Sequence, residues 1–416
     1  MRVVLLSEFF CKNMGYLENM LPKYLARLGA ETHVIATDLS PSYRQKSANA
    51  ANTGACEPLL AGTVEVRDGF TLHILGHKSV AGYMRMLGLW EKLYSIRPDI
   101  VQTIAVAGWI PLEAALYQPL IGYKLFTGCH MTASVFPLAS ENLPWWSKKR
   151  LACLLSRAVP GRFTSLFAEV CYGATSDCAD VAVRFFGVPR DKINVCPLGV
   201  DVELFSPISN GKAIEGRLDL RRRLGFVESD IVCIYTGRFT EDKNPVLLAR
   251  AIAQLVRRGE SFRGLFVGDG FQAQAIQSCS GCVIHAYVPV QHLGQFFRAA
   301  DIGAWPTQES MSMLDAAACG LPIVVNHTLA ARERIEGNGL TYNLNDVEDL
   351  IRVLLVLRDS ETRQRLGGLG TLKMSNDFSW ESVAKRRLHD YDVALGTPKS
   401  STAGEAEPIH SGQARF

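Results

Sequence analysis

Residues 231–256, IVCIYTGRFTEDKNPVLLARAIAQLV, combine a short apolar run, a loop with charged residues and a helical pattern. This order predicts a strand over Ile231–Thr236 and a helix that starts at Pro245, because proline has the φ angle of a first helical residue and needs no donor there. In open α/β sheets, ligands bind at the carboxyl ends of the strands. We therefore expect Arg238 at the strand end and Lys243 just before the helix to face a cleft.

Arg238 and Lys243 are the first candidate functional residues. Two cations at such a place could neutralise a diphosphate and stabilise the charge of a departing one. The alternative is a solvated basic loop, which is the usual setting of arginine and lysine. The position at a strand end favours a function over that alternative.

The same alternation of short strands and helices continues on both sides of this stretch. It is typical of βαβ units in a parallel sheet, so we predict an α/β fold. In the first half, strands are predicted over Val3–Leu6, Thr32–Ile35, Leu72–Ile74, Ile100–Thr103, Lys124–Thr127 and Val170–Ala174, with a helix over Leu17–Leu28. In the second half, further strands are predicted over Gly264–Val267, Val283–His285, Ile302–Trp305 and Ile323–Asn326.

The chain of 416 residues is long enough for two domains. The segment Asn194–Pro207 contains two prolines and a glycine and predicts a linker, and the charged stretch Lys212–Arg223 predicts an exposed helix. We expect two Rossmann-like doubly wound domains, residues 1–200 and 201–376, that face a cleft. The pattern then predicts a last amphipathic helix over residues 377–395 and a disordered tail over residues 396–416.

Composition argues against several classes of protein. The net charge is only +3, from 44 basic and 41 acidic residues, so no nucleic-acid partner is expected. The eleven cysteines are odd in number and lie mostly in apolar runs, which predicts buried thiols in a reducing cytosol rather than a disulfide framework. The one C-x-x-C, Cys279–Cys282, has no second pair, and we interpret it as a loop coincidence rather than a zinc or redox site.

Neither a signal peptide nor a membrane span is expected. The first residues, MRVVLLSEFF, lack a basic cluster and a small-residue cleavage site and are interpreted as a first strand. Residues 100–123 are apolar but contain Pro111, Glu113 and Pro119, so we expect a buried strand followed by a helix. These observations predict a cytoplasmic protein.

A second candidate region follows the predicted strand at Ile302–Trp305. A mostly polar loop, Thr307–Ser312, leads into a helix that we expect to begin near Met313, so that free backbone N–H groups point at an anion. The carboxylates of Glu309 and Asp315 could accept hydrogen bonds from sugar or ribose hydroxyls. For Asp315, simple compensation of the helix dipole is an equally open interpretation.

These motifs together resemble the family 4 retaining glycosyltransferases of GT-B fold, the glycosyl transferases group 1. The resemblance extends over most of residues 1–395 and is most specific over residues 185–325. The matching elements are C-P-L-G-V-D-V-E-L-F-S-P (196–207), G-R-x-x-x-x-K-N-P (237–245), V-G-D-G (267–270), Tyr287-Val288, A-D-I-x-x-x-P (300–306), E…D-A-A-A-C-G-L-P (309–322) and F-S-W-E (378–381).

The resemblance implies a role for each candidate residue. Arg238 and Lys243 would hold the diphosphate of a nucleotide sugar, and Glu309 and His130 would lie near the transferred sugar. Residues 1–200 would form the acceptor-side domain, residues 201–376 the donor-binding domain and residues 377–395 a closing helix on the first domain. The implied donor-binding residues are Gly15, Gly237, Tyr287, Val288, Ser310, Met311, Ser312, Met313 and Asp315.

Three departures from the family pattern are visible. The two acids, Glu309 and Asp315, are six positions apart instead of eight, and Thr307 stands eight before Asp315. Either the loop is shortened or the first acid is displaced. The second acid is an aspartate instead of the usual glutamate, and Met14 replaces the first glycine of the usual pair.

The implied reaction is sugar transfer with retention, in which the acceptor hydroxyl attacks from the face that the diphosphate leaves. The leaving phosphate oxygen would take the proton of the acceptor, a glycan, glycolipid or small molecule in polysaccharide or glycoconjugate biosynthesis. The only D-x-D, Asp390–Asp392, lies in the last helix, so neither a metal nor another cofactor is expected. The alternatives are a nucleotide-sugar epimerase or hydrolase of the same fold and a non-catalytic nucleotide-sugar-binding protein.

One segment suggests a membrane partner. LPWWSKKR, residues 143–150, combines aromatic and basic side chains as an interfacial segment does, and a lipid-linked acceptor at the inner face of the membrane would explain it. An ordinary exposed helix start is an equally open interpretation. The residues concerned are Trp145, Trp146, Lys148, Lys149 and Arg150.

Overall fold

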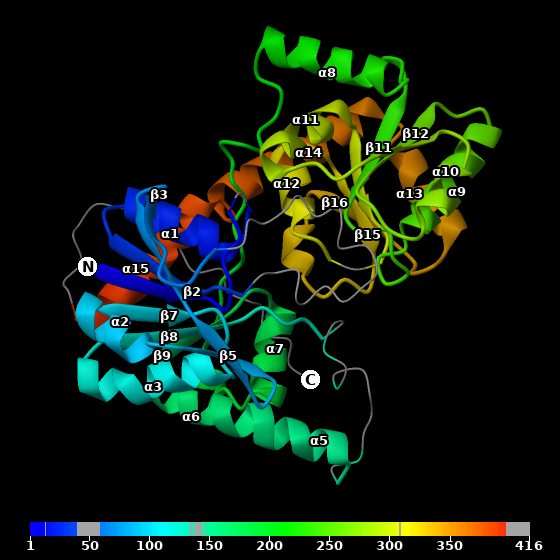
Figure 1. Cartoon of the computed structure of the whole chain (residues 1–416). Helices are drawn as coiled ribbons and strands as arrows, with labels where there is room; N and C mark the ends of the chain where they lie inside the picture. The colour runs from blue at the N-terminus through cyan, green and yellow to red at the C-terminus, as the bar shows by residue number, and fades with distance from the viewer. Residues whose placement is uncertain are drawn as a thin grey trace.

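The computed structural model describes residues 1–396 except residues 13, 40–58, 134, 135, 137, 139–143, 145 and 308. Trp145 and all of the predicted tail except Gly396 therefore lie outside the described residues. The chain forms two α/β domains, and its last helix crosses back to the first of them (Figure 1).

The first domain is built on an eight-stranded sheet in the order β10-β9-β8-β7-β1-β2-β4-β3. All neighbours in this sheet are parallel except β3 and β4. Its strands are β1 Arg2–Leu6, β2 Glu31–Thr37, β3 Val64–Arg67, β4 Phe70–Leu75, β7 Ile100–Thr103, β8 Lys124–Cys129, β9 Ala168–Gly173 and β10 Ile193–Val195, and a separate hairpin joins β5 His77–Val80 to β6 Tyr83–Met86.

Helices cover both faces of this sheet (Figure 1). Along β1, Val3 and Leu5 pack into a core with α1, and Val4 and Leu6 pack into a second core with α2 and α3. A strand buried on both faces has the continuous apolar sequence that β1 shows. The helices are α1 Leu17–Arg27, α2 Leu89–Ile96, α3 Trp109–Ile121, α5 Lys148–Cys153, the π-helical turn η2 Leu154–Ala158, α6 Val159–Phe167 and α7 Ser176–Phe185.

The second domain is a six-stranded, fully parallel sheet in the order β13-β12-β11-β14-β15-β16. This is the Rossmann strand order, and it reverses between β11 and β14, where such folds bind their ligands. The strands are β11 Ile231–Thr236, β12 Phe262–Val267, β13 Cys282–His285, β14 Ile302–Trp305, β15 Ile323–Asn326 and β16 Gly339–Tyr342. The helices are α8 Gly211–Arg223, α9 Pro245–Arg257, α10 Ala273–Gln277, α11 Val290–Ala299, α12 Ser312–Ala318, α13 Val347–Val356 and α14 Ser360–Asn376.

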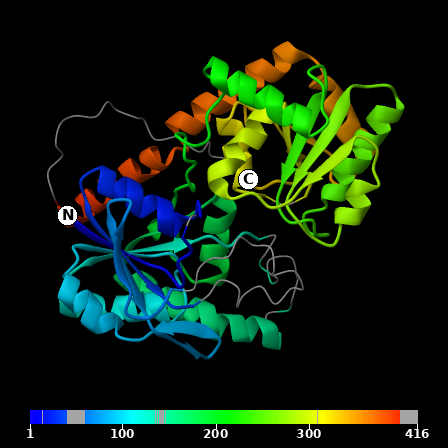
Figure 2. The same cartoon turned by 45° about the horizontal axis from the view of Figure 1, so that its top comes forward.

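The two domains are connected twice. The first connection follows β10. The first two residues of the predicted linker, Asn194 and Val195, therefore belong to a strand of the first sheet. The second connection leads into α15, Trp380–Leu395, which lies beside α1 (Figure 2). The two connections pair with each other, because the Val200 N–H donates to the Phe378 carbonyl at 2.7 Å and the Trp380 N–H donates to the Val200 carbonyl at 3.1 Å.

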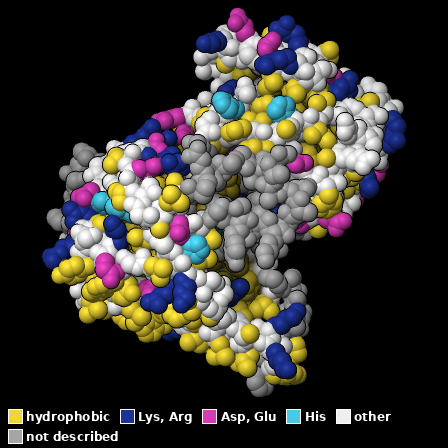
Figure 3. Space-filling view, in the orientation of Figure 1, with side chains coloured by type: hydrophobic (Ala, Val, Ile, Leu, Met, Phe, Trp, Pro, Cys, Tyr) yellow, Lys and Arg dark blue, Asp and Glu magenta, His cyan; other side chains and the backbone are white. Residues whose placement is uncertain are grey.

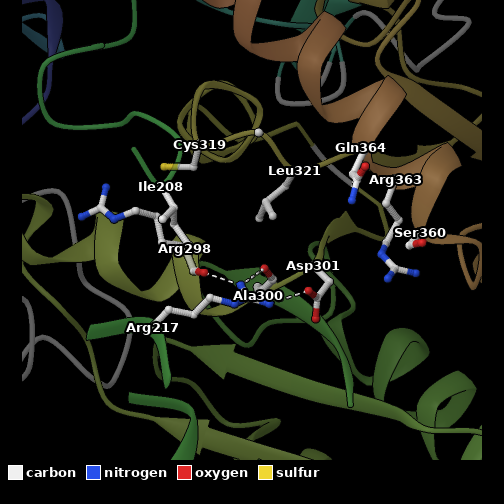
Figure 4. A pocket seen from close by; sticks show the side chains of 11 residues that line it. Ile208, Arg217, Arg298, Ala300, Asp301, Cys319, Leu321, Ser360, Arg363 and Gln364 are labelled. Carbon is white, nitrogen blue, oxygen red and sulfur yellow. Dashed lines mark hydrogen bonds and ion pairs between the residues drawn. The ribbon is translucent and has the colours of Figure 1, made fainter. Parts of the chain in front are cut away.

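The prediction of an exposed helix over Lys212–Arg223 is wrong for two of its arginines. Arg221 of α8 is only 2% exposed, and both Arg217 and Arg221 bind the carboxylate of Asp301, at 2.7 and 3.1 Å. Figure 4 shows Arg217 directed at Asp301, beside a cavity of about 240 Å³. Asp301 directly precedes β14, so this cavity lies at the amino-terminal ends of the strands, opposite the loops predicted to bind a ligand.

Among the described cysteines, most are buried free thiols as predicted, but Cys279 and Cys282 are only partly buried. Cys11 is disulfide-bonded, and that part of the prediction is wrong. The free thiols are those of Cys129, Cys153, Cys171, Cys178, Cys196, Cys233, Cys279, Cys282 and Cys319.

The apolar stretch over residues 100–123 forms β7 and α3, as predicted. In the part of the chain that the structure describes, no helix is both long enough and apolar enough to cross a membrane.

Candidate active site

The loop after β11 is held against the loop after β12. The Phe239 N–H donates to the Asp269 carbonyl at 2.8 Å, and the Phe239 ring is buried. Gly268 has a φ of 149°, and a Cβ atom there would lie 1.9 Å from the carbonyl oxygen of Gly237. Only glycine permits so close a contact between the two loops. The backbone around Arg238 is therefore fixed at the edge of the sheet where the strands end.

The two cations of this loop have different environments. The Arg238 side chain is 65% exposed, with Asp242 at 3.9 Å as its nearest acid partner. Lys243 is partly buried, and its Nζ donates to the backbone carbonyl of Glu309 at 2.9 Å. Burial lowers the pKa of Lys243, and neighbouring Arg238 lowers it further, while Asp242 and Glu309 oppose this shift. Lys243 thus lies inside the site and Arg238 at its rim.

Glu309 lies on the loop after β14. Its carboxylate is 15% exposed and accepts a hydrogen bond from Nη1 of Arg334, a 5% exposed arginine, at 3.1 Å. Burial raises the pKa of Glu309, and Arg334 is the first of the groups that oppose this rise. The loop itself is held by buried Asn326, whose Nδ2 donates to the carbonyls of Pro306 and Thr307 at 3.0 and 2.8 Å.

A cavity of about 190 Å³ lies between the two domains. It brings together Lys243, Glu309 and His130, three of the four predicted catalytic residues; Arg238 is not among the residues that line it. Thr307 does not line it either, whereas Glu309 does. Its lining residues are His130, Thr132, Ala174, Thr175, Cys178 and Leu198 from the first domain and linker, and Lys243, Glu309, Ser310, Met311 and Arg334 from the second domain.

His130 follows β8 and contributes a neutral imidazole. Burial lowers its pKa to about 4, and the positive charge of Arg387 contributes to this shift. Its Nδ1 is buried and has no hydrogen-bond partner among the described residues. A neutral ring at neutral pH can exchange hydrogen bonds with a sugar hydroxyl without adding charge to the site.

Of the predicted donor-binding residues, Ser310 and Met311 line this cavity. A Cβ atom on Gly15 would lie 3.6 Å from Val290, so the loop after β1 faces the start of α11 in the second domain. Tyr287 is partly exposed and Val288 is buried directly before that helix.

One part of the anion prediction needs correction. The helix starts at Ser312, one residue before the predicted start, and the Met313 N–H already donates to the Ser310 carbonyl at 3.2 Å. Ser312 directs its N–H at Oγ of Ser310, at 3.4 Å. These two amides are therefore engaged within the turn and do not point freely at an anion.

Two family models match this chain. "Glycosyltransferase Family 4" matches residues 20–204, and "Glycosyl transferases group 1" matches residues 230–359. The chain belongs to the family 4, group 1 glycosyltransferases. The GT-B fold, two Rossmann-like domains that face a cleft, is the architecture described above.

Relatives and solved structures agree with the family. A D-inositol 3-phosphate glycosyltransferase of Thermomonospora curvata is 28% identical over 251 residues, which are 55% of this chain and 58% of that relative. One of Nocardia farcinica is 29% identical over 249 residues, 55% of this chain and 54% of that relative. The chain thus spans little more than half the length of these relatives.

Among solved structures, a glycosyltransferase of Rickettsia africae has a TM-score of 0.68 at 13% identity and covers 95% of this chain and 99% of its own. HepE of Anabaena, solved in complex with UDP and glucose, has a TM-score of 0.65 at 15% identity and covers 96% of this chain and 100% of its own. At these identities the likeness concerns the fold alone.

Asp315 of this family 4 chain lies in the first turn of α12. Burial raises its pKa to about 8, and the negative charge of Asp201 in the linker adds to this rise. The folded protein therefore holds the Asp315 proton up to about pH 8. An unfolded aspartate loses its proton near pH 4. The stability that this proton contributes is complete below about pH 4 and is lost as the pH rises to about 8.

We therefore expect Asp315→Asn to gain stability over the wild type as the pH rises. The asparagine cannot ionise, so the melting temperature of the variant should exceed that of the wild type at pH 9 by more than at pH 5. Thermal unfolding at both pH values measures this difference, with exposed Asp191→Asn as the matched control. An equal difference at both pH values would show that Asp315 is ionised throughout.

Arg334, which lines the cavity, and Asn326, which holds the loop of Glu309, were not revealed as site residues by the motifs, and neither were the lining residues Thr132, Ala174, Thr175, Cys178 and Leu198. Asn326 is the last residue of β15 and Arg334 lies in the turn that follows it, and β15 lies next to β14 in the sheet. The carboxyl ends of neighbouring parallel strands lie at the same edge of a sheet, so residues at and after the end of β15 could have been expected near the loop after β14. Arg334 lies in the run ARER, which is typical of an exposed turn, and the buried acid that it binds is distant in sequence.

Proposed function

We propose that this chain is a retaining glycosyltransferase that moves a sugar from a nucleotide-diphosphate sugar to a hydroxyl of an acceptor. The observation that carries the proposal is the cavity between the domains, where Lys243 and Glu309 of one domain meet His130 of the other. It lies at the strand-order reversal of the second sheet, where Rossmann folds bind nucleotides. Family membership and the two-domain fold support the same reaction class.

In this proposal the protein's own cations bind the diphosphate. Lys243 inside the cavity and Arg238 at its rim would neutralise the charge that grows on the leaving group. The acceptor hydroxyl attacks the anomeric carbon from the face that the diphosphate leaves, and its proton goes to the leaving phosphate oxygen. Glu309 and neutral His130 would contact the transferred sugar.

Metal independence is part of the proposal. The one D-x-D lies in α15, where Asp390 accepts a hydrogen bond from the Tyr172 hydroxyl at 2.7 Å, so this acid is used by the first domain's core. Among the described residues, no group of three or more His, Cys, Asp and Glu side chains is placed to hold a metal ion. Turnover that survives an excess of EDTA would agree with this part, and loss of turnover that Mg²⁺ or Mn²⁺ restores would overturn it.

The substrates to test first come from the related proteins. HepE was solved with UDP and with UDP-glucose, and the curated relatives are named for D-inositol 3-phosphate. Thermal-shift screening of UDP-, GDP- and ADP-sugars would identify the donor, because a ligand that binds only the folded state raises the melting temperature. Inositol phosphates and lipid-linked glycans are the acceptors to combine with that donor.

Product analysis of the reaction with this donor, with and without an acceptor, distinguishes the competing functions. Sugar transfer only in the presence of an acceptor supports the proposal. An altered or hydrolysed sugar without an acceptor indicates an epimerase or hydrolase. A donor that binds without turnover across the acceptor panel indicates a binding protein.

We also propose that the first domain contacts an anionic membrane surface from the cytoplasmic side. Figure 3 shows hydrophobic side chains gathered along the lower edge of this domain, below α3 and along α5 and α6. The basic residues Lys148, Lys149 and Arg150 are exposed at one end of this surface. Exposed apolar side chains beside basic ones are typical of proteins that lie on a bilayer. The exposed apolar residues are Trp146, Leu151, Leu154, Leu155, Val159 and Leu166, with Leu116 and Leu120 on α3.

Leu155→Glu should weaken binding to vesicles that contain anionic lipid. Leu372→Glu on α14 is the matched control, because both leucines are 61% exposed and they lie in different domains. Co-sedimentation with anionic and with neutral vesicles measures the effect, and we expect the control to bind like the wild type. Equal binding of the two variants, or no binding of the wild type to anionic vesicles, would contradict a membrane contact through this surface.

A further inference from the structure

Arg334 is a buried arginine in the candidate active site. It ends a single 3-10 turn, Arg332–Arg334, and the next residue, Ile335, is buried. Lys373 of α14 donates to the carbonyl of Glu333 in this turn at 2.9 Å. The buried Ile335 and the hydrogen bond from Lys373 therefore hold the backbone on both sides of Arg334, which fixes the position of its Cα atom.

The Arg334 side chain forms a buried ion pair with Glu309. Both side chains line the cavity between the domains, and Nη1 of Arg334 lies 3.1 Å from Oε2 of Glu309. Removing one partner of a buried pair leaves an uncompensated charge, which is strongly unfavourable. Nε of Arg334 is buried without a hydrogen-bond partner among the described residues. This nitrogen faces no acceptor of the described protein, so part of the guanidinium is left for a further hydrogen bond beside the cavity.

Two contacts favour the ionised form of Glu309, the charge of Arg334 and a hydrogen bond from the backbone of Ala331. Burial disfavours its ionised form, and the acids that face it, Asp177 from α7 and Glu333 from the turn, act in the same direction. Arg334 is the leading group that opposes them. Nζ of Lys243 binds the backbone of Glu309, not its carboxylate. The charged and titratable groups around Glu309 are Arg334, Glu333, Asp177, Lys243, Cys178 and His130.

We propose that Arg334 is the positioning residue that holds Glu309, the first of the two acids in this chain, ionised and directed at the transferred sugar. This inference rests on the proposed transferase function. The acid of this loop stands at Glu309 and not at position 307, and Nη1 of Arg334, from the turn that follows β15, donates to its carboxylate at 3.1 Å.

A double-mutant cycle on turnover tests the proposal. Arg334→Gln should lower kcat by about 100-fold, since a misplaced group in a reacting site has an effect of that order. Arg334→Lys keeps the charge and should lose less. In a Glu309→Gln background, Arg334→Gln should lower kcat little further, because the residue through which it acts is already altered. Exposed Arg332→Gln on the same turn is the matched control and should keep wild-type kcat.

The pH profile separates positioning from a general loss of structure. Without Arg334 the pKa of Glu309 rises, so the acid limb of the kcat profile should move to higher pH by about one unit. An unchanged acid limb, or additive effects of the two substitutions, would overturn the proposal.

A carboxyl titration followed by ¹³C NMR gives a readout that needs no turnover. The Glu309 signal is identified as the one missing from Glu309→Gln, and Arg334→Gln should raise its pKa. If the wild type transfers no sugar but this shift is seen, the proposed function fails and the interaction between the two residues stands. If transfer occurs and the titration is unchanged, Arg334 does not act on Glu309.

Discussion

Lys243→Ala should lower kcat for sugar transfer by about 10²- to 10³-fold, the effect of removing one group that stabilises charge in a transition state. Lys243 is the cation inside the cavity, and its Nζ already lies 2.9 Å from the carbonyl oxygen of Glu309. Since burial lowers its pKa, the site has partly desolvated this charge before any ligand binds. A desolvated cation interacts with a diphosphate more strongly than an exposed one does.

Because Arg238 is more exposed than Lys243, we expect the two alanine substitutions to lower kcat by different amounts. Arg238→Ala should lower kcat less than Lys243→Ala, because Arg238 is exposed at the rim and its charge is screened by solvent. Lys212→Ala changes an exposed lysine on α8 and is the control for the loss of one positive charge. Initial rates at saturating donor, with the melting temperature of each variant as a check of folding, measure these effects. Wild-type rates for both Lys243→Ala and Arg238→Ala would refute the diphosphate assignment.

The strands that could be predicted from the sequence are those with continuous apolar runs. Ile100–Thr103, Ile231–Thr236, Ile302–Trp305 and Ile323–Asn326 have the predicted bounds, because a central parallel strand is buried on both faces. Three of the four edge strands, β3, β10 and β16, were missed, whereas the edge strand β13 was predicted over Val283–His285. The burial along Val64–Arg67 alternates between exposed and partly buried residues, so it has no apolar run to reveal it.

A candidate site residue could be predicted from the sequence where its position after a strand was enough to select it. Lys243 and Glu309 each lie in the loop between a strand and the next helix, and the strand-end rule was enough to select them. Arg334 and the paired arginines of α8 were not predictable, because each is defined by an acid far away in sequence: Glu309 for the first and Asp301 for the others. A charged run has the same composition whether it faces water or a buried carboxylate.

Trp380→Ala should destabilise the first domain by about 3–5 kcal/mol, the usual loss for a large aromatic side chain in a core. Trp380 starts α15 and is only 2% exposed, and it belongs to the same core as Val3, Leu5 and Leu21. The last helix of the chain therefore completes the first domain. Urea unfolding should show an earlier transition for this domain, with the transition of the second domain in place.

A second substitution approaches the same contact from the linker. A Cβ atom on Gly199 would lie 2.6 Å from the Trp380 ring, so Gly199→Ala should displace the ring and destabilise the same domain. Trp146→Ala is the control of matched type, since Trp146 is 68% exposed, and substitutions at exposed positions usually change stability by less than about 0.5 kcal/mol. An unchanged first transition in both Trp380→Ala and Gly199→Ala would mean that α15 is not part of this core. If both substitutions lower the urea concentration of the first transition, the hydrogen-bonded connections at Val200 and Trp380 hold the closing helix on the first domain.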